Sequence, residues 1–436
     1  MNLLVLCPHF TPDVAPTGDV ITAIALELTR RGHRLHVVTS LPWYRHHAVE
    51  PGWDGQLVRH EDAPWGRLTR VHPFPTDKAN IPARAVAFGG FTALAALEGA
   101  ITSARPDVVL AMSPPLTLGP AGWAVARSRR VPFVFNIQDV FPDVAVELGL
   151  LTNPMAIAAA ARLERATYLR ADAVTVLSDE LARNVGDKLV GGDDGPAAQQ
   201  RRAKVHVIPN FVDTEAVRPA EPDNAYRAEH GLTGKRVVMY AGNVGFSQSL
   251  DLVLEVARRL ADRPGVAFVI NGGGSARPSL EARAAELGLT NVTFVDMQPR
   301  SRLPEVRAAG DVHVVPLKRG LAKASVPSKL YSILAAGRPV VASVDPGTEV
   351  ARTVERAGAG ATVDPEDADA LHRALVALLD DDEGRAEMGR SARRFVESWA
   401  SPAAVAAAYE SLFDRLVAER GRHPVGLSPV RSRGPI

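Results

Sequence analysis

Residues 324–349 read ASVPSKLYSILAAGRPVVASVDPGTE, and this stretch predicts a loop, a helix, a buried strand and a second loop. Pro327 suits the first helical position, where a backbone N–H is not needed. Gly337 ends the predicted helix and Pro339 follows it. Apolar residues recur at helical spacing, at Leu330, Ile333 and Leu334. Residues 340–342 then form a short buried strand.

The start of this helix is a candidate anion site. A helix N-terminus offers free N–H groups and a partial positive charge, and Lys329 adds a full charge in the first turn. Ser328 and Lys329 could therefore hold a diphosphate. The alternative is an ordinary capped helix of an α/β domain with a solvated lysine.

The wider pattern resembles a known family. Pro-Ser-Lys-Leu-Tyr at 327–331 and Ala-Ala-Gly-Arg-Pro-Val at 335–340 are similar to the donor-site segment of the family 4 glycosyltransferases, in their bacterial surface-polysaccharide branch. Members commonly carry two glutamates eight positions apart, of which the first faces the sugar and the second binds the ribose. Here those positions hold Ala324 and Ser332.

Composition sets limits on the function. The 436 residues suffice for two or three domains, and a net charge of +1 gives no basic field for nucleic acid. Cys7 is the single cysteine, so no internal disulfide forms and a reducing, cytoplasmic setting is expected. The weakly polar run 85–104 contains Glu98 and is a poor transmembrane candidate, which leaves a buried or membrane-surface helix.

The N-terminal half begins as a strand, a glycine turn, a helix and a second strand over residues 3–39. The turn lacks Gly-x-Gly-x-x-Gly, so a nicotinamide enzyme is not expected, and Gly18 would allow close backbone approach to the donor. Residues 40–80 are predicted to be a mobile acceptor-side loop. The adjacent His46 and His47 suit no single face of a helix or strand, so metal binding there is disfavoured.

A second polar cluster follows the buried strand 131–137. Its sequence, QDVFPD at 138–143, resembles the Gln-Asp-x-Trp/Phe-Pro-Asp/Glu motif of the same transferase branch. Ligands of open α/β sheets bind at the carboxyl ends of strands. Asp139 is therefore the candidate catalytic or acceptor-positioning group, with capping of the next helix as its alternative role.

The predicted donor site lies in the second half. The strand from Val237 runs into the turn of Gly242, Asn243 and Gly245. Relatives place Arg and Lys in this turn, whereas this chain has Asn243 and Ser249 there, so backbone N–H groups would bind the phosphates. The missing charge is assigned to one or more of Lys318, Arg319, Lys323 and Lys329.

The resemblance implies a set of site residues. Asp139 and Lys329 are the predicted catalytic residues, and the segment after residues 292–295 is where relatives lay the base. The predicted nucleotide-sugar contacts are Gly18, Gly242, Asn243, Gly245, Met297, Gln298, Ser328, Lys329, Leu330, Ser332 and Glu349. No metal site is predicted.

The resemblance also implies an α/β, GT-B fold of two Rossmann-like domains with parallel sheets facing a central cleft. Pro-Asn-Phe-Val-Asp at 209–213 resembles the family's domain junction. The predicted division is an acceptor domain 1–212, a linker 213–235, a donor domain 236–400, a helix 401–420 that crosses back to the first domain, and a disordered tail 421–436.

The implied reaction is retaining glycosyl transfer from a nucleotide sugar, expected to be UDP-linked, to a saccharide or polyprenyl-linked acceptor. No cofactor is expected, and relatives often let the leaving phosphate take the acceptor proton. Arg84 and the apolar run after it could rest on the inner face of a membrane. The alternatives are a non-hydrolysing UDP-sugar 2-epimerase and a catalytically idle nucleotide-sugar-binding scaffold.

Overall fold

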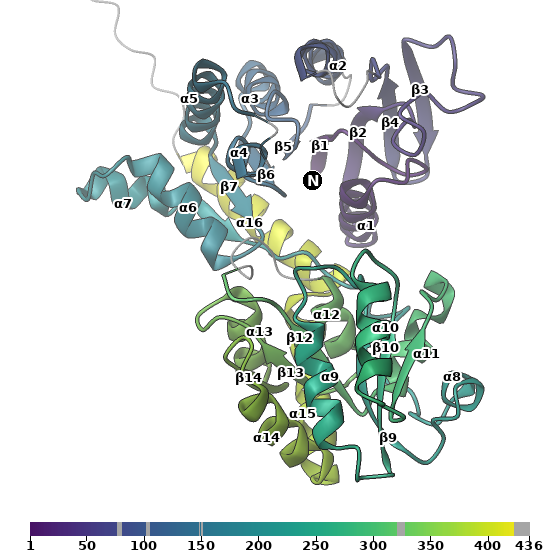
Figure 1. The fold of residues 1–436 in the computed structure, drawn as a ribbon. Helices are drawn as coiled ribbons and strands as arrows, with labels where there is room; N and C mark the ends of the chain where they lie inside the picture. Colours follow the sequence, from purple (N-terminus) through teal and green to yellow (C-terminus); the bar gives the residue numbers. More distant parts are fainter. Residues whose placement is uncertain (76–80, 102–104, 148, 150, 321–327, 423–436) are drawn as a thin grey trace, which may run out of the picture. The chain divides into compact units, whose positions relative to one another are not determined.

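A computed structural model describes residues 1–75, 81–101, 105–147, 149, 151–320 and 328–422. The chain divides into two compact units (Figure 1). Unit 1 comprises Met1–Ile208 together with the segment that begins at Ala406, and unit 2 comprises Pro209–Val405. Each unit is an α/β domain built on one mainly parallel sheet, which confirms the predicted fold class.

Unit 1 contains an eight-stranded sheet in the order β3-β4-β2-β1-β5-β6-β7-β8, in which only the pair β3–β4 is antiparallel. Every residue of β5 and β6 is buried, as expected for parallel strands covered on both faces. The strands are β1 (Asn2–Leu6), β2 (Arg34–Ser40), β3 (Val58–Ala63), β4 (Gly66–Val71), β5 (Val108–Ser113), β6 (Phe133–Ile137), β7 (Ala173–Val176) and β8 (Val205–Val207).

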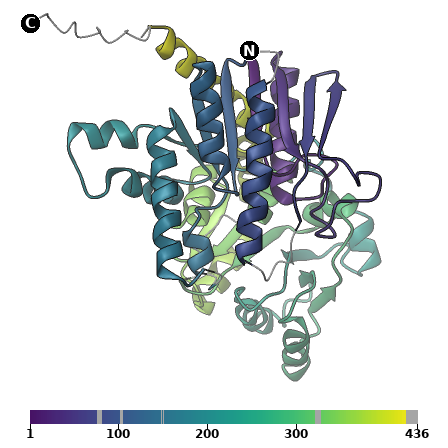
Figure 2. The same cartoon turned by 90° about the horizontal axis from the view of Figure 1, so that it is seen from above.

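The helices of unit 1 lie along this sheet, and Figure 2 shows α2, α3 and α5 side by side. The C-terminal helix also joins unit 1, because the hydroxyl of Tyr409 bonds to Asn136 at 2.8 Å. The helices are α1 (Pro16–Arg30), α2 (Ile81–Ile101), α3 (Leu118–Arg129), α4 (Asp143–Glu147), α5 (Pro154–Arg170), α6 (Asp179–Val190), α7 (Pro196–Arg202) and α16 (Pro402–Arg422).

The prediction of a mobile loop over residues 40–80 is wrong for residues 58–63 and 66–71. Strands β3 and β4 form a hairpin there, and β4 pairs in parallel with β2. Their charged residues hide the alternation that would have indicated strands. Arg70 in β4 is 2% exposed because its guanidinium bonds to Glu61 of β3 and to the carbonyl oxygen of Thr11.

Unit 2 contains a six-stranded, fully parallel sheet in the order β11-β10-β9-β12-β13-β14. Alternate residues of β9 enter two different cores: Val238 and Tyr240 pack on one face, and Val237 and Met239 on the other. The strands are β9 (Arg236–Ala241), β10 (Val266–Asn271), β11 (Val292–Val295), β12 (Val312–Pro316), β13 (Val340–Ser343) and β14 (Gly360–Val363).

The opening stretch of the sequence folds as predicted where it is described. Leu330, Ile333 and Leu334 are at most 1% exposed and pack beside β13. The helices of unit 2 are α8 (Ala225–Glu229), α9 (Leu250–Arg259), α10 (Arg277–Glu286), the 3₁₀ helix η1 (Arg300–Arg302), α11 (Leu303–Ala309), α12 (Ser328–Ala335), α13 (Glu349–Ala357), α14 (Ala368–Leu379) and α15 (Asp382–Trp399).

The predicted linker, 213–235, and the predicted tail, 421–436, can be compared with the structure. Residues 213–235, the predicted linker, lie within unit 2, and Tyr226 of α8 is fully buried in that unit's core. The predicted disordered tail, 421–436, lies outside the described residues except for Gly421 and Arg422, which end α16.

Candidate functional site

The strand order of unit 2 reverses direction between β9 and β12. From β9 the chain first adds β10 and β11 on one side, and then returns to add β12, β13 and β14 on the other. Such a reversal leaves a crevice outside the carboxyl ends of the two strands, where ligands of open parallel sheets bind. The turn of Gly242 and Asn243 follows β9 at this point, and Lys329 reaches the same place from α12.

Lys329 is held in a defined position. Its ammonium Nζ donates a hydrogen bond to the hydroxyl of Tyr240 at 2.9 Å and lies 4.3 Å from the centre of that ring. A β-carbon placed on Gly242 would lie 3.2 Å from Nζ, so the lysine packs directly against the glycine. Desolvation, with a smaller contribution from the Arg307 charge, lowers the pKa of Lys329 to about 8.

Arg307 is a candidate site residue that the sequence analysis missed. It lies on α11, is 5% exposed, and donates from Nη1 to the carbonyl oxygen of Ala241 at 3.2 Å. Its Nε is buried without a hydrogen-bond partner among the described residues, and burial lowers its pKa to about 10. The available signal was an arginine inside the otherwise apolar run Val306–Ala309.

Lys329 and Arg307 are therefore two desolvated cations beside the same turn. In the described part of unit 2, no carboxylate forms an ion pair with either of them. Two desolvated positive charges without a counter-charge are costly, and an anion that binds between the β9 turn and α12 would offset that cost. The arrangement suits a diphosphate better than a neutral ligand.

The glycine turn contributes less to anion binding than its sequence predicts. The N–H groups of Gly242 and Val244 bond to the carbonyl oxygens of Asn271 and Gly273, and the N–H of Gly245 bonds to the side chain of Gln248. These three donors already have partners within the protein. Nucleotide contacts of Gly242 and Gly245 therefore stay predictions, and the cationic side chains become the more important donors of positive charge.

Close backbone approach explains why the turn is rich in glycine. A β-carbon on Gly272 would lie 1.9 Å from the carbonyl oxygen of Gly242, and Gly272 has a φ of +151°. Only glycine fits there. Asn243 is exposed at the tip of the turn, and its amide lies against Gly245, where an added β-carbon would be 2.8 Å from Nδ2.

The other residues predicted on α12 and α13 contact their own helices or the hydrophobic core. The hydroxyl of Ser332 donates to the carbonyl oxygen of Lys329 at 2.8 Å, and Leu330 is a core side chain. Glu349 accepts from Arg352 at 3.0 Å and is 6% exposed. Ser328 begins α12, whereas Ala324 and Lys323 lie outside the described residues. Ligand contacts of these residues stay predictions.

The predicted base-contacting residues follow β11, which is separated from β9 by β10. Met297 is 63% exposed, and the amide of Gln298 donates to the carbonyl oxygen of Asp296 at 3.1 Å. Neighbouring strands are about 4.8 Å apart, so these residues begin about 10 Å from the β9 turn along the same edge. That separation fits a base at one end and a diphosphate at the other.

In unit 1, Asp139 follows β6 at the carboxyl edge of the sheet. Asp139 is an exposed residue. Partial desolvation of its carboxyl group nevertheless raises the pKa of Asp139 above the usual value. No side-chain hydrogen bond from Asp139 to another described residue caps α4. Gly18 lies within the first turn of α1, where an added β-carbon would be 3.0 Å from the Cβ atom of His9.

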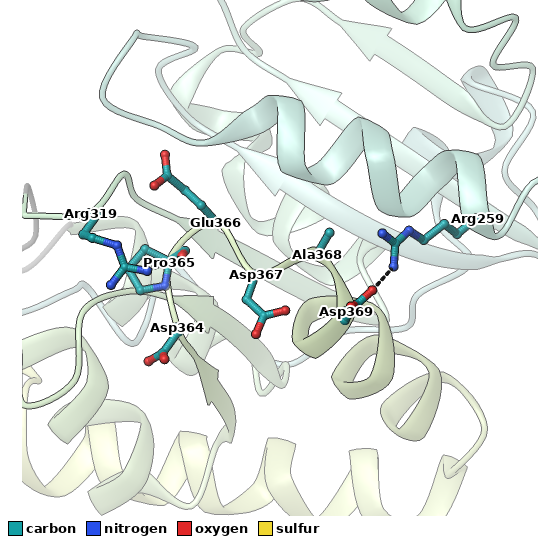
Figure 3. Close-up of a pocket in the computed structure, with 8 residues that line it drawn as sticks. All are labelled: Arg259, Arg319, Asp364, Pro365, Glu366, Asp367, Ala368 and Asp369. Atoms are coloured by element: carbon teal, nitrogen blue, oxygen red, sulfur yellow. Dashed lines mark hydrogen bonds and ion pairs between the residues drawn. The ribbon is translucent and has the colours of Figure 1, made fainter.

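Unit 2 also has an open hollow of about 440 Å³ at the end of β14 (Figure 3). Arg319 and Arg259 line it, and they bond to the carbonyl oxygen of Pro365 and to Asp369 respectively. Four carboxylates line the same hollow, on Asp364, Glu366, Asp367 and Asp369. Their charge opposes a diphosphate, so Arg319 is an unsuitable source of the missing donor-site charge.

Affinity for a diphosphate is expected to fall as the pH rises above about 8. Lys329 is charged below that pKa and neutral above it, and an anion binds the charged form, so binding above pH 8 takes up a proton. Calorimetric titration with a diphosphate ligand from pH 7 to 9.5 would show affinity falling by up to about tenfold per pH unit. Constant affinity across this range would contradict the assignment.

The lowered pKa of Lys329 has the opposite consequence for stability: raising the pH stabilises the ligand-free fold. The folded-state pKa of Lys329, about 8, lies below its ordinary value of 10.5, so the unfolded chain binds more protons between these values. The contribution of Lys329 to the free energy of unfolding therefore rises as the pH increases from about 8 toward 10.5.

Comparison with known proteins agrees with this geometry. A family model for "Glycosyl transferases group 1" matches residues 222–395, and one for a "Glycosyl transferase 4-like domain" matches residues 17–211. The putative colanic acid biosynthesis glycosyl transferase WcaI of Escherichia coli K12 is 28% identical over 380 residues, which cover 85% of this chain and 90% of WcaI.

Solved structures share the fold. Sucrose-phosphate synthase from Thermosynechococcus elongatus superposes with a TM-score of 0.66 at 18% identity, over 96% of this chain and 100% of that one. HepE of Anabaena, solved in complex with UDP, gives a TM-score of 0.60 at 14% identity, over 95% and 100% of the two chains.

The two sheets and their strand order define a GT-B protein, the class of two Rossmann-like units found in these neighbours. Together the two family models account for most of the chain. The chain belongs to the family 4-like glycosyltransferases and is a glycosyltransferase of glycan biosynthesis.

Proposed function

We propose that this enzyme transfers a sugar, with retention of anomeric configuration, from a UDP-linked donor to a saccharide or polyprenyl-linked saccharide. The observation that carries the donor class is the pair of desolvated cations, Lys329 and Arg307, beside the β9 turn. They would stabilise the charge that develops on the departing diphosphate. Crystals of HepE, a protein of the same fold, contain UDP and UDP-glucose, which supports a uridine nucleotide.

The alternatives receive no support. Both family models describe glycosyltransferases rather than epimerases, which disfavours a UDP-sugar 2-epimerase. In the described residues no group of three or more His, Cys, Asp or Glu side chains could hold a metal ion. The proposal assigns charge stabilisation to Lys329, Arg307 and the start of α12, because the two cations lie beside the β9 turn.

A nucleotide screen tests the proposed donor. Purified protein would be titrated with UDP, GDP and dTDP by calorimetry, and thermal unfolding would be measured with each. A ligand present at about 100 times its dissociation constant adds about 2.7 kcal/mol to the free energy of unfolding. A response to UDP alone is expected. A response to GDP or dTDP alone would contradict the UDP-linked donor and assign the donor to that nucleotide instead. No response to any nucleotide would contradict the proposed donor site.

Peripheral membrane contact is a further part of this proposal, because a polyprenyl-linked acceptor resides in a membrane. In the described chain, no helix has the length and apolar character needed to cross a bilayer. One face of α2 packs into the core through Phe91 and Ala95. Its opposite face exposes apolar side chains, at Val86, Leu97 and Ile101. Arg84 also lies on α2, in its first turn.

Vesicle binding tests this contact. Leu97→Asp is expected to reduce co-sedimentation with phosphatidylethanolamine–phosphatidylglycerol vesicles, because it places a charge in the apolar face of α2. Leu26→Asp is the matched control, because it adds the same charge at an exposed leucine of a different helix, α1. This control is expected to bind vesicles as the wild-type protein does. Equal binding of wild-type protein and Leu97→Asp, or no binding by wild-type protein, would contradict membrane contact through α2.

A further inference from the structure

A buried histidine–carboxylate pair lies at the carboxyl edge of the unit 1 sheet. His9 follows β1, and its Nδ1 lies 2.6 Å from Oδ2 of Asp13. The side chain of Asp13 is fully buried. Its second oxygen, Oδ1, accepts the backbone N–H groups of Trp43 at 3.3 Å and Tyr44 at 3.0 Å. Both residues come from the loop after β2, so the carboxylate is fixed by three donors.

These contacts determine the tautomer of His9. An ionised carboxylate only accepts hydrogen bonds, so Nδ1 carries a proton, and in the neutral ring Nε2 presents its lone pair. The ring is stacked against Trp43, with ring centres 5.7 Å apart, and meets Tyr44 edge-on. Within the described residues, the bond to Asp13 is the one hydrogen bond of this ring, and 11% of the side-chain surface stays exposed.

The pair lies where a ligand is expected. In unit 1 the strand order reverses between β1 and β5, because β2 and β4 lie on one side of β1, and β5 to β8 lie on the other. His9 lies three residues after the end of β1, at this reversal. Asp139 lies at the same edge, after β6, two strands from β1. Gly18 lets α1 approach, since any β-carbon there would crowd the Cβ atom of His9.

We propose that His9, oriented by Asp13, is a catalytic residue on the acceptor side of the transfer reaction, an inference that rests on the proposed function. Nε2 accepts the hydrogen bond of the attacking acceptor hydroxyl. The acceptor oxygen forms its bond to the anomeric carbon on the face from which the diphosphate departs, so the configuration is retained. The bond from that carbon to the diphosphate breaks, and its electron pair leaves with the diphosphate. The acceptor proton passes to Nε2, and Asp13 stabilises the resulting imidazolium.

A ligand-independent measurement tests the geometry first. In wild-type protein with ¹⁵N-labelled histidine at pH 8, the NMR spectrum is expected to show Nε2 of His9 unprotonated, with assignment by the spectrum of His9→Gln. In Asp13→Asn, the amide Nδ2 would donate to Nδ1 and move the proton to Nε2. A protonated Nε2 in the wild-type protein would overturn the proposal.

Kinetics test the catalytic role. The assay follows UDP release from UDP-glucose and UDP-N-acetylglucosamine, with decyl-diphosphate-linked N-acetylglucosamine as acceptor. His9→Gln and Asp13→Asn are each expected to lower kcat about 10²- to 10⁴-fold while the donor KM and the UDP affinity stay unchanged. Turnover by His9→Gln at the wild-type rate would overturn the role, as expected if the leaving phosphate takes the proton instead.

A matched control separates catalysis from structure. His33 also pairs with a carboxylate, with Nε2 2.9 Å from Glu410, but it precedes β2 and so lies at the amino edge of the sheet. His33→Gln is expected to keep full turnover. An equal loss in His33→Gln would show that the effect of His9→Gln is structural. If the wild-type protein neither binds UDP nor turns over, the proposed donor fails, whereas the NMR measurement still decides the state of His9.

Discussion

Lys329→Met is expected to weaken UDP binding about 100-fold, a loss of about 2.7 kcal/mol. Methionine keeps the length of the side chain but removes the ammonium group that lies against Gly242 and bonds to Tyr240. Removing one partner of a desolvated, charge-assisted interaction costs about 2–5 kcal/mol. Calorimetric titration with UDP at pH 7 measures the effect. The pH dependence of binding above pH 8 should disappear in the same variant.

The control for this prediction lies at the amino end of β9, away from the turn that Lys329 contacts. Lys235 precedes β9 and is exposed at the amino edge of the sheet, so Lys235→Met removes an equal charge away from the site. Its UDP affinity should equal that of the wild-type protein. If Lys329→Met also binds UDP normally, Lys329 is not a donor-site cation.

Arg307→Met extends the test to the second cation. We expect weaker UDP binding together with a higher midpoint of thermal unfolding in the ligand-free protein. The guanidinium is buried with an unpartnered Nε among the described residues, and a well-packed apolar side chain avoids that desolvation cost. If Arg307→Met raises the unfolding temperature and weakens UDP binding, the Arg307 charge serves ligand binding rather than stability. A loss of stability with normal affinity would make Arg307 a structural residue.

The second large effect concerns turnover rather than donor binding. Asp139→Asn is expected to lower kcat about 10²-fold or more with unchanged UDP affinity, because Asp139 belongs to unit 1 and the two cations to unit 2. The raised pKa of its carboxyl group shows partial desolvation at an exposed position, which is typical of a functional carboxylate.

Asp172 provides the comparison for Asp139. Its carboxylate accepts the N–H of Phe133 at 2.8 Å, at the amino end of β6, whereas Asp139 follows the carboxyl end of that strand. Asp172→Asn is expected to change stability slightly and leave turnover intact. Wild-type turnover by Asp139→Asn would remove Asp139 from the candidate catalytic residues.

Much of the fold could be predicted because apolar periodicity is visible in one dimension. The run Val237–Ala241 and the helical spacing of Leu330, Ile333 and Leu334 correspond to β9 and α12. The hairpin β3–β4 could not be found this way. Its charged residues satisfy one another across the strands, as Arg70 and Glu61 do, so their burial depends on a pairing that local sequence does not contain.

Some residues of the candidate site could be predicted from local sequence, whereas others depend on tertiary contacts. Lys329 and Gly242 could be identified because each belongs to a local motif with its own physical meaning. Arg307 could not, because its significance depends on the carbonyl group of Ala241 and on the missing counter-charge. The role of Asp13 in orienting His9 depends on the loop after β2, which supplies two N–H donors to its carboxylate.

The sequence alone determined the fold class, the family resemblance and the position of Lys329 at the start of a helix, since these follow from periodicity and from short motifs. The tertiary structure alone decided which groups are desolvated and what they face. Charge cost, tautomer and pKa depend on distances between atoms that are far apart in the chain. For this reason the second cation at Arg307 and the pair of His9 and Asp13 appeared only in three dimensions.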